Sequence, residues 1–254
     1  MPWIRPPYPV ERGHAGVPTV VQNAETLAHA AWIGAHSPEA FASIGSEGSP
    51  GTKLVTILGR VNQPGVAEIP MGTPLMEIPN LAGGGTGPVK ALFVGGPGGG
   101  AIEAASLELA YDYEHLAERG ARVGSGAILV ADADTCMVDT ARFLLDFSAR
   151  EACGKAVPCR IGTRRLVEAL DRILAATPRP GDFDLLRDLS RKMADTALCG
   201  LEALAPNPML TTLERFPEEY RAHAERGECL SGACRTEGLP PLLQPFNSIE
   251  PAAS

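Results

Sequence analysis

The sequence predicts an α+β protein in which a small mixed-sheet domain precedes a four-helix-bundle domain. Two observations carry this prediction. Short apolar runs separated by glycine and proline, which are typical of strands, fill the segment from Lys53 to Asp134. From Val138 onward the apolar residues recur with the 3.6-residue period of amphipathic helices, in four stretches joined by short loops. The 254 residues suffice for two compact domains.

Each expected element follows from its local pattern. A helix is expected over residues 23–36, where apolar side chains share one face, and residues 37–41 add a further turn. The expected strands are KLVTILGRV, GVAEIP, ALFVGG and GAILVADAD. The four helices of the bundle are expected at residues 138–151, 164–176, 183–198 and 210–227. The proline-rich tail PPLLQPFNSIEPAAS is expected to be extended or disordered.

The charge and the cysteine content limit the class of function. A formal net charge of -8 argues against a surface for nucleic acid or anionic membrane, because both need clustered Lys and Arg. No apolar run is long enough to span a bilayer, and the proline-rich start lacks the apolar centre of a signal peptide, so we expect a cytoplasmic protein without direct membrane insertion. In that compartment, six cysteines indicate metal or redox chemistry rather than disulfides.

The first cysteine set is Cys153 and Cys159, six positions apart before a predicted helix, with Cys199 forty positions further on. Thiolates are the ligands of iron–sulfur clusters, and a tight loop of three cysteines plus one remote cysteine supplies four of them. Here Ala156 occupies the central position of the loop. On spacing alone, buried structural thiols are the better interpretation.

The second set is His223, Cys229 and Cys234, within AHAERGECLSGAC at the end of the last predicted helix. One imidazole and two thiolates at this spacing can reach a single tetrahedral ion, and Cys136 in DADTCMVD would complete a Cys3His site for zinc. The alternative is a solvent-facing histidine and free thiols at a frayed terminus. Cys136 is the least certain ligand, because nothing local fixes its distance to the other three.

The run VGGPGGGAIEAA contains Gly96, Gly98 and Ala101 at the spacing of a dinucleotide-binding fingerprint. That fingerprint requires a helix immediately after the turn, packed in a βαβ unit. The surrounding strand-like runs provide no such helix, so we interpret these glycines as a tight turn within the sheet domain.

The residues around the first cysteine set resemble a known family. EACGKAVPCRIGT and TALCGLEALAPNPMLTTLERFPEEY are similar to the C-terminal iron–sulfur domain of NADH-oxidising flavoprotein subunits, which occur in respiratory complex I, NAD-coupled iron hydrogenases and formate dehydrogenases. In that family the loop carries three cysteines and a [4Fe–4S] cluster. Cys153, Cys159 and Cys199 match three ligands, and Ala156 departs at the fourth. Upstream, GTKLVTILGRVNQPGVAEIPMGTPLMEI resembles the family's soluble-ligand-binding β-grasp domain.

The resemblance implies a domain order and a set of partners. Residues 1–50 would be a remnant of the join to a flavin domain, 51–135 the β-grasp domain, 136–226 the helical iron–sulfur domain and 227–254 a cysteine-containing, proline-rich tail. The family's FMN- and NADH-binding half has no counterpart here, so FMN and NADH would be bound only through a partner or missing domain, and the chain alone would not be catalytic. The implied partners are other oxidoreductase subunits, including a flavin-binding domain and a ferredoxin-like subunit.

Two functions remain open from the sequence. In the first, the chain is an electron-transfer subunit or fragment of an NADH-dependent oxidoreductase complex. Its cluster would then be a [4Fe–4S] cluster with one open iron, or a [3Fe–4S] cluster. In the second, it is a non-redox structural or assembly module that kept both folds, with zinc at the second cysteine set. Ala156 favours the second function, whereas the three retained cysteines favour the first.

Overall fold

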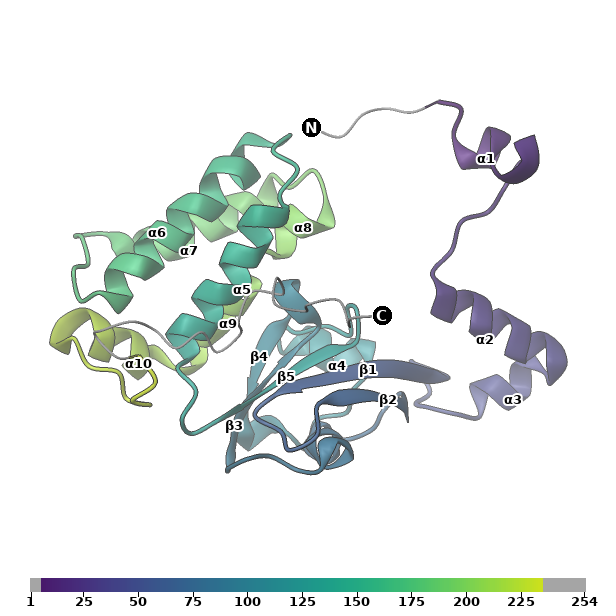
Figure 1. The fold of residues 1–254 in the computed structure, drawn as a ribbon, viewed down its shortest axis with the longest axis horizontal. Helices are drawn as coiled ribbons and strands as arrows, with labels where there is room; N and C mark the ends of the chain where they lie inside the picture. The colour runs from purple at the N-terminus through teal and green to yellow at the C-terminus, as the bar shows by residue number, and fades with distance from the viewer. Residues whose placement is uncertain (1–5, 235–254) are drawn as a thin grey trace, which may run out of the picture.

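The computed structural model describes residues 6–234, so the predicted proline-rich tail lies outside the described residues. An N-terminal helical segment leads into a sheet domain, and further helices follow (Figure 1). The N-terminal elements are α1 Pro9–Arg12, η1 His14–Gly16, α2 Ala24–Ala35 and α3 Pro38–Ala42. Those of the sheet domain are β1 Thr52–Gly59, β2 Gly65–Pro70, η2 Leu75–Ala82, β3 Val89–Val94, η3 Gly96–Gly98, β4 Gly100–Glu103, η4 Ala104–Ser106, α4 Tyr113–Glu118 and β5 Ala127–Asp132. The remainder are α5 Met137–Glu151, η5 Pro158–Gly162, α6 Thr163–Leu174, α7 Asp182–Asp195, α8 Gly200–Leu204, α9 Asn207–Arg215, α10 Pro217–Arg221 and η6 Ala222–Arg226.

The predicted mixed sheet is confirmed, and β4 is a fifth strand that was not predicted. Its five strands have the order β2-β1-β5-β3-β4, with β1 parallel to β5 and the other neighbours antiparallel. Both faces of β3 are covered. Leu92 and Val94 join the core formed with η2 and α4, while Ala91 and Phe93 face α5 on the other side. Because successive side chains of a strand point to opposite faces, covering both faces requires an unbroken apolar run, and ALFV supplies it.

The glycine-rich run forms a hairpin connection. Strand β3 runs through the short 3-10 turn η3 into β4, and the two strands pair antiparallel, with Val94 opposite Gly100. A dinucleotide fingerprint needs a helix at this point. The prediction of a tight turn is therefore confirmed.

Helices α5, α6, α7 and α9 bury apolar residues in one core, to which Tyr220 of α10 also contributes. The prediction of one continuous helix over residues 210–227 is wrong. The chain breaks at Phe216 into α9 and α10, because Pro217 disfavours helical backbone at the residue before it; Phe216 has φ -125° and ψ 47°. The π-helical turn η6 continues from α10, and Gly227, at φ +62°, ends it. The helix expected over 183–198 ends earlier, at Asp195, which leaves Cys199 at the start of α8.

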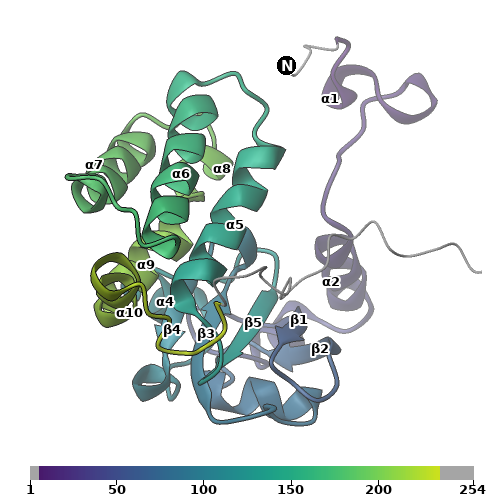
Figure 2. The same cartoon turned by 60° about the vertical axis from the view of Figure 1, so that its left-hand side comes forward.

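Helix α9 holds the helical part against the sheet. Asn207 at its start donates hydrogen bonds from Nδ2 to the carbonyl oxygens of Gly99 (3.0 Å) and Gly120 (2.6 Å), and Arg215 at its end pairs with Glu103 at 3.0 Å. Figure 2 shows α5 and α9 between the sheet and the outer helices α6 and α7. The two domains predicted from the sequence thus share an extensive interface.

Helix α2 lies on the opposite side of the sheet domain from α6 and α7 (Figures 1 and 2). Asn23 caps its N-terminus by accepting a hydrogen bond from the Glu25 amide at 2.8 Å. The Glu25 carboxylate also accepts from the Leu54 amide at 2.7 Å, which ties α2 to strand β1. No helix in the described residues 6–234 is long and apolar enough to cross a bilayer.

Candidate metal and cluster sites

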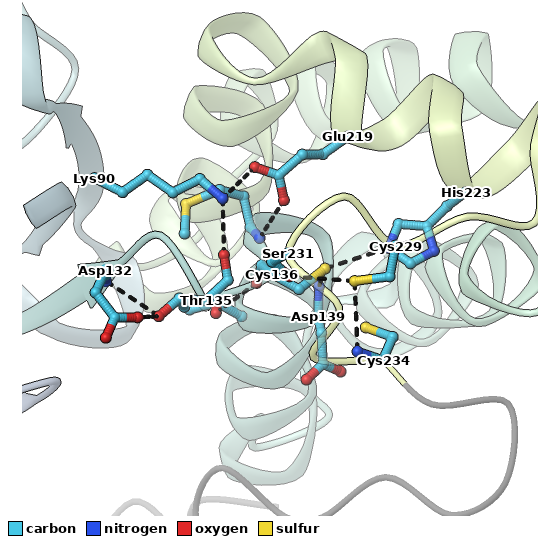
Figure 3. Close-up of polar contacts among 12 residues, drawn as sticks. Lys90, Asp132, Thr135, Cys136, Asp139, Glu219, His223, Cys229, Ser231 and Cys234 are labelled. Atoms are coloured by element: carbon cyan, nitrogen blue, oxygen red, sulfur yellow. Dashed lines mark hydrogen bonds and ion pairs between the residues drawn. The ribbon is translucent and has the colours of Figure 1, made fainter. Parts of the chain in front are cut away.

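The second cysteine set converges with Cys136. One donor atom each from Cys136, His223, Cys229 and Cys234 lies within 4.8 Å of all the others. Figure 3 shows these side chains pointing toward a common centre, from the start of α5, from η6 and from the turn after it. The sequence prediction of these four residues as neighbours is consistent with this geometry, including Cys136, which lies 87 positions before His223.

Local backbone geometry positions each donor. Cys136 is the N-cap of α5, and its Sγ accepts a hydrogen bond from the Asp139 amide at 3.5 Å. Its Sγ also lies 3.3 Å from Nε2 of the buried His223. After Gly227 reverses the chain, the Cys234 amide donates to Sγ of Cys229 at 3.4 Å. The segment after η6 therefore folds back so that Cys229 and Cys234 lie next to each other.

The electrostatics of this group favour a thiolate. The pKa of Cys136 is lowered to about 4, first by a hydrogen bond from the Cys234 thiol and also by His223, and these effects outweigh burial. The same hydrogen bond raises the pKa of Cys234. Burial acts to lower the pKa of His223, but its hydrogen bond to Cys136 and the charge on Cys136 raise it overall. Burial and the Cys136 charge also raise the pKa of Asp139. Cys136 is thus the favoured thiolate of the group, and its charge favours the protonated forms of its neighbours His223, Asp139 and Cys234.

Three sulfurs and one imidazole nitrogen match the donor set of a tetrahedral zinc site. Thiolates that bind one zinc ion at about 2.3 Å lie about 3.8 Å apart, which the observed donor spacing permits. These residues fit a single metal ion, and the site is enclosed because Cys136 and His223 are buried.

The first cysteine set has a more open arrangement. Cys159 is buried in the π-helical turn η5, whereas Cys153 in the preceding loop and Cys199 at the start of α8 are exposed. Burial raises the pKa of Cys159, and the charges of Glu202, Cys199 and Cys153 raise it further, so these groups are electrostatic neighbours. Within residues 6–234 their sulfurs do not form the close donor group seen at Cys136. Cysteines of a multi-iron cluster bind different irons and therefore stand further apart than ligands of one ion.

The loop between Cys153 and Cys159 is shaped by its own residues. Gly154 has φ +77°, which a side chain would strain. The Arg160 guanidinium donates to the Gly154 carbonyl at 2.5 Å, and the Arg160 amide donates to the Ala156 carbonyl at 2.9 Å. Ala156 therefore sits at the centre of a closed loop, flanked by the two cysteines.

Gly162 brings this loop close to the side chains of α7. A side-chain carbon added at Gly162 would lie 2.6 Å from Sδ of Met193, so a larger residue there would require the Met193 side chain to shift. Helix α8 follows α7 after a short turn, and Figures 1 and 2 both show α8 near the end of α5 and the start of α6. The cysteines of the first set are thus carried by adjoining elements.

One acidic residue near this set was not predicted from the sequence. Glu202 is fully buried on α8, and its Oε2 accepts a hydrogen bond from the Leu198 amide at 2.9 Å. Within residues 6–234, its Oε1 has no hydrogen-bond partner. The only signal in the sequence is an acidic residue three positions after Cys199.

The other described histidines lie outside both cysteine sets. His36 stacks on Trp32, and His29 packs against Phe41. His115 on α4 shares a hydrogen bond at Nδ1 with Asp112, which raises the pKa of His115. His14 lies in the N-terminal turn η1.

An α+β fold with one compact Cys3His donor group and one set of loop cysteines has the donor types found in metal-binding proteins. Residues 139–223 match the model of the NADH-ubiquinone oxidoreductase-F iron-sulfur binding region, and residues 54–105 match the SLBB domain. The chain belongs to the family of NADH-oxidising flavoprotein subunits, and it corresponds to their C-terminal part. The resemblance stated from the loop residues is thereby confirmed.

Relatives of this family match over most of the chain. The NADP-reducing hydrogenase subunit HndC of Solidesulfovibrio fructosivorans is 42% identical over 236 residues, covering 92% of this chain and 48% of the relative. An NADH-quinone oxidoreductase subunit of Rhizobium meliloti (strain 1021) is 36% identical, covering 90% and 55%. A crystal structure of an NAD+-reducing [NiFe]-hydrogenase in the H2-reduced state aligns with a TM-score of 0.77 at 31% identity, covering 89% of this chain and 38% of that chain. The chain spans about half the length of the curated relatives that it matches.

Proposed function

We propose that this chain carries electrons within an NADH-dependent oxidoreductase complex, through an iron–sulfur cluster held by Cys153, Cys159 and Cys199. The match of residues 139–223 to an iron–sulfur binding region is the observation that carries the proposal, because it contains all three cysteines. When bound, the cluster supplies one-electron transfer. The similarity to subunits of an NADP-reducing hydrogenase and of an NADH-quinone oxidoreductase supports a role in this class of complex.

The residues of the loop would hold the cluster and limit its exposure to water. Cys159, only 5% exposed, would anchor it on the side facing α7. The hydrogen bond from Arg160 to Gly154 keeps Cys153 close to the same centre and places a cation beside a group that becomes more negative on reduction. Ala156 presents a methyl group, so three thiolates serve a cluster that takes four ligands.

We also propose that Cys136, His223, Cys229 and Cys234 bind a structural zinc ion. The ion would link the start of α5 to the segment after η6. A metal that is bound only by the folded chain contributes its binding free energy to folding.

The domain boundaries predicted from the sequence become part of this proposal. The β-grasp domain would span residues 51–135, and α5, α6, α7 and α9 would form the four-helix bundle of an iron–sulfur domain over residues 136–226. The matched ranges 54–105 and 139–223 fall inside these limits. A flavin-binding domain would deliver electrons from NADH, and a ferredoxin-like subunit would exchange electrons with the cluster.

A second candidate is a structural or assembly module of such a complex without a redox role. One observation favours it: Ala156 removes a thiolate from the loop, while the four donors of the Cys136 group remain complete. The module would then keep zinc and lack the cluster.

The two candidates separate in a reduction experiment. The chain, reconstituted anaerobically with iron and sulfide, is mixed with NADH in the presence and absence of a flavin-binding subunit of an NADH-oxidising complex. We expect cluster reduction, followed by electron paramagnetic resonance, only when the flavin-binding subunit is present. A reconstituted cluster that dithionite reduces but that NADH with flavoprotein leaves oxidised would contradict the electron-transfer role.

A further inference from the structure

The buried carboxylate of Glu202 has an unused oxygen beside the proposed cluster. Oε2 accepts a hydrogen bond from the Leu198 amide, whereas Oε1 has no partner among the described residues 6–234, and the side chain is 0% exposed. In the described part of the chain, no Lys, Arg or His forms an ion pair with it. A buried ionised carboxylate without a partner is destabilising by several kcal/mol, and a bound cation would remove this cost.

The position of Glu202 relative to the cysteines supports a ligand role. Cys199 is the N-cap of α8, and Glu202 follows it by less than one turn of the same helix. Among charged groups, Glu202 is the strongest electrostatic neighbour of Cys159. The hydrogen bond from the Leu198 amide fixes one carboxylate oxygen, which leaves the other held in a defined direction. The side chain is thus anchored by the same short helix that carries one of the proposed cluster cysteines.

We propose that Oε1 of Glu202 is the fourth protein ligand of the cluster and binds the iron that Ala156 leaves without a thiolate. The inference rests on the proposed function, since it assumes that the three cysteines hold a cluster. The carboxylate would donate an electron pair to that iron in place of a water molecule, with no change of oxidation state. If the carboxyl group is protonated in the metal-free chain, its proton would pass to solvent when the cluster binds.

Other side chains near the loop are less suited to this role. Lys155 adjoins Ala156, but it is exposed, and its ammonium has no lone pair to donate. Glu151 lies two positions before Cys153, but it is exposed to water, which compensates its charge. Glu202 combines a buried position, an unpartnered oxygen and a fixed orientation.

Glu202→Gln removes the charge and keeps the shape. The carboxamide oxygen still accepts from the Leu198 amide, so the metal-free variant is expected to unfold at the same temperature as the native chain or at a higher one. Ala156→Cys restores a thiolate at the open position. Glu151→Gln, which neutralises an exposed carboxylate close to the same loop, is the matched control.

The experiment reconstitutes the full chain and its variants anaerobically with iron and sulfide, and then follows conversion to the [3Fe–4S] form by electron paramagnetic resonance during mild oxidation. We expect Glu202→Gln to lose the fourth iron at least about tenfold faster than the native chain, since even loss of outer-shell partners costs that much. Ala156→Cys added to Glu202→Gln should restore slow loss, and Glu151→Gln should behave as native.

Mössbauer spectra of the native chain loaded with 57Fe provide a test that does not depend on the Glu202 variant. We expect one iron with a larger isomer shift than the other three, as oxygen ligation gives, and four similar irons in Ala156→Cys. Equal loss rates in native and Glu202→Gln, or four similar irons in the native chain, would overturn the inference and leave the proposed function intact. Absence of iron and sulfide from every variant would instead overturn the proposed function, and this inference with it.

Discussion

At the scale of single residues, the two cysteine sets differ in how completely their surroundings position them. All four donors of the Cys136 group lie close together. Cys136 is the N-cap of α5, His223 is buried in η6, and the chain turns at Gly227 to bring Cys229 and Cys234 back to them. The residue types and spacing of His223, Cys229 and Cys234 predicted three members of this group. The local sequence does not show that Cys136 lies near the other three donors. That proximity depends on how α5 packs against α10.

Residue-level chemistry predicts that zinc is bound by this group. Purified without added metal, the chain should contain about one zinc ion, and Cys136→Ser should contain less than about a tenth of that, because a hydroxyl is a poor ligand for zinc. Elemental analysis measures both. His115→Ala is the control, since His115 lies on α4 and contacts Asp112 instead. Full zinc content in Cys136→Ser would remove Cys136 from the ligand set.

At the scale of elements, helix periodicity predicted α5, α6 and α7 within a few residues, because each has one apolar face. Pro217 signals the helix break at Phe216. The prediction of one helix instead followed the apolar pattern, which continues on both sides of this proline. The short helix α8 was not predicted, since five residues are too few to show a period.

The turn between α6 and α7 is held by one ion pair. The carboxylate of Asp182, 4% exposed, accepts hydrogen bonds from the Arg172 guanidinium and from the Arg179 amide. The hydrogen bond and charge of Arg172 lower the pKa of Asp182 below its ordinary 3.8, although burial opposes this. Because the pKa is lower in the folded state, the interaction stabilises the fold fully above pH 3.8 and is lost as the pH falls through the lowered value.

Asp182→Asn should therefore lower the free energy of unfolding by about 1–3 kcal/mol at neutral pH, since it removes charged hydrogen bonds in a buried position. The difference from the native chain should shrink as the pH is lowered below 3.8. Urea unfolding at several pH values measures it. Asp184→Asn, an exposed acidic residue of the same first turn, should change the free energy little. If Asp182→Asn lowers the free energy of unfolding by the same amount at every pH, the stabilising role of the ionised Asp182 carboxylate is contradicted.

At the scale of the whole molecule, the chain packs its helices on a sheet that periodicity had predicted as a separate domain. Besides the apolar packing of β3 on α5, the docking uses Asn207, whose Nδ2 donates to two carbonyl oxygens of the sheet domain, Gly99 and Gly120. No pattern in the sequence indicated this contact, because its partners lie 108 and 87 positions away. Sequence patterns specify the elements here, whereas their docking depends on apolar and polar contacts between residues that are far apart in the sequence.

Two substitutions at Asn207 test this docking. Asn207→Ala should lower the free energy of unfolding by about 0.5–1.5 kcal/mol, because it removes two hydrogen bonds to carbonyl oxygens that are not fully buried bonds. Asn207→Asp should cost more, since a carboxylate would face two carbonyl oxygens and repel them. Thermal or urea unfolding compares the variants. An Asp variant as stable as the native chain would show that the interface does not depend on this donor.

The central claim is that Cys153, Cys159 and Cys199 hold an iron–sulfur cluster although Ala156 replaces a thiolate. The most direct measurement is the iron and acid-labile sulfide content of the full chain after anaerobic reconstitution, compared with the Cys159→Ser variant. We predict three to four irons and about four sulfides per native chain, the composition of [3Fe–4S] and [4Fe–4S] clusters, and little of either in the variant. A native chain that retains zinc and takes up no iron and sulfide, with or without its partner subunits, would contradict the claim.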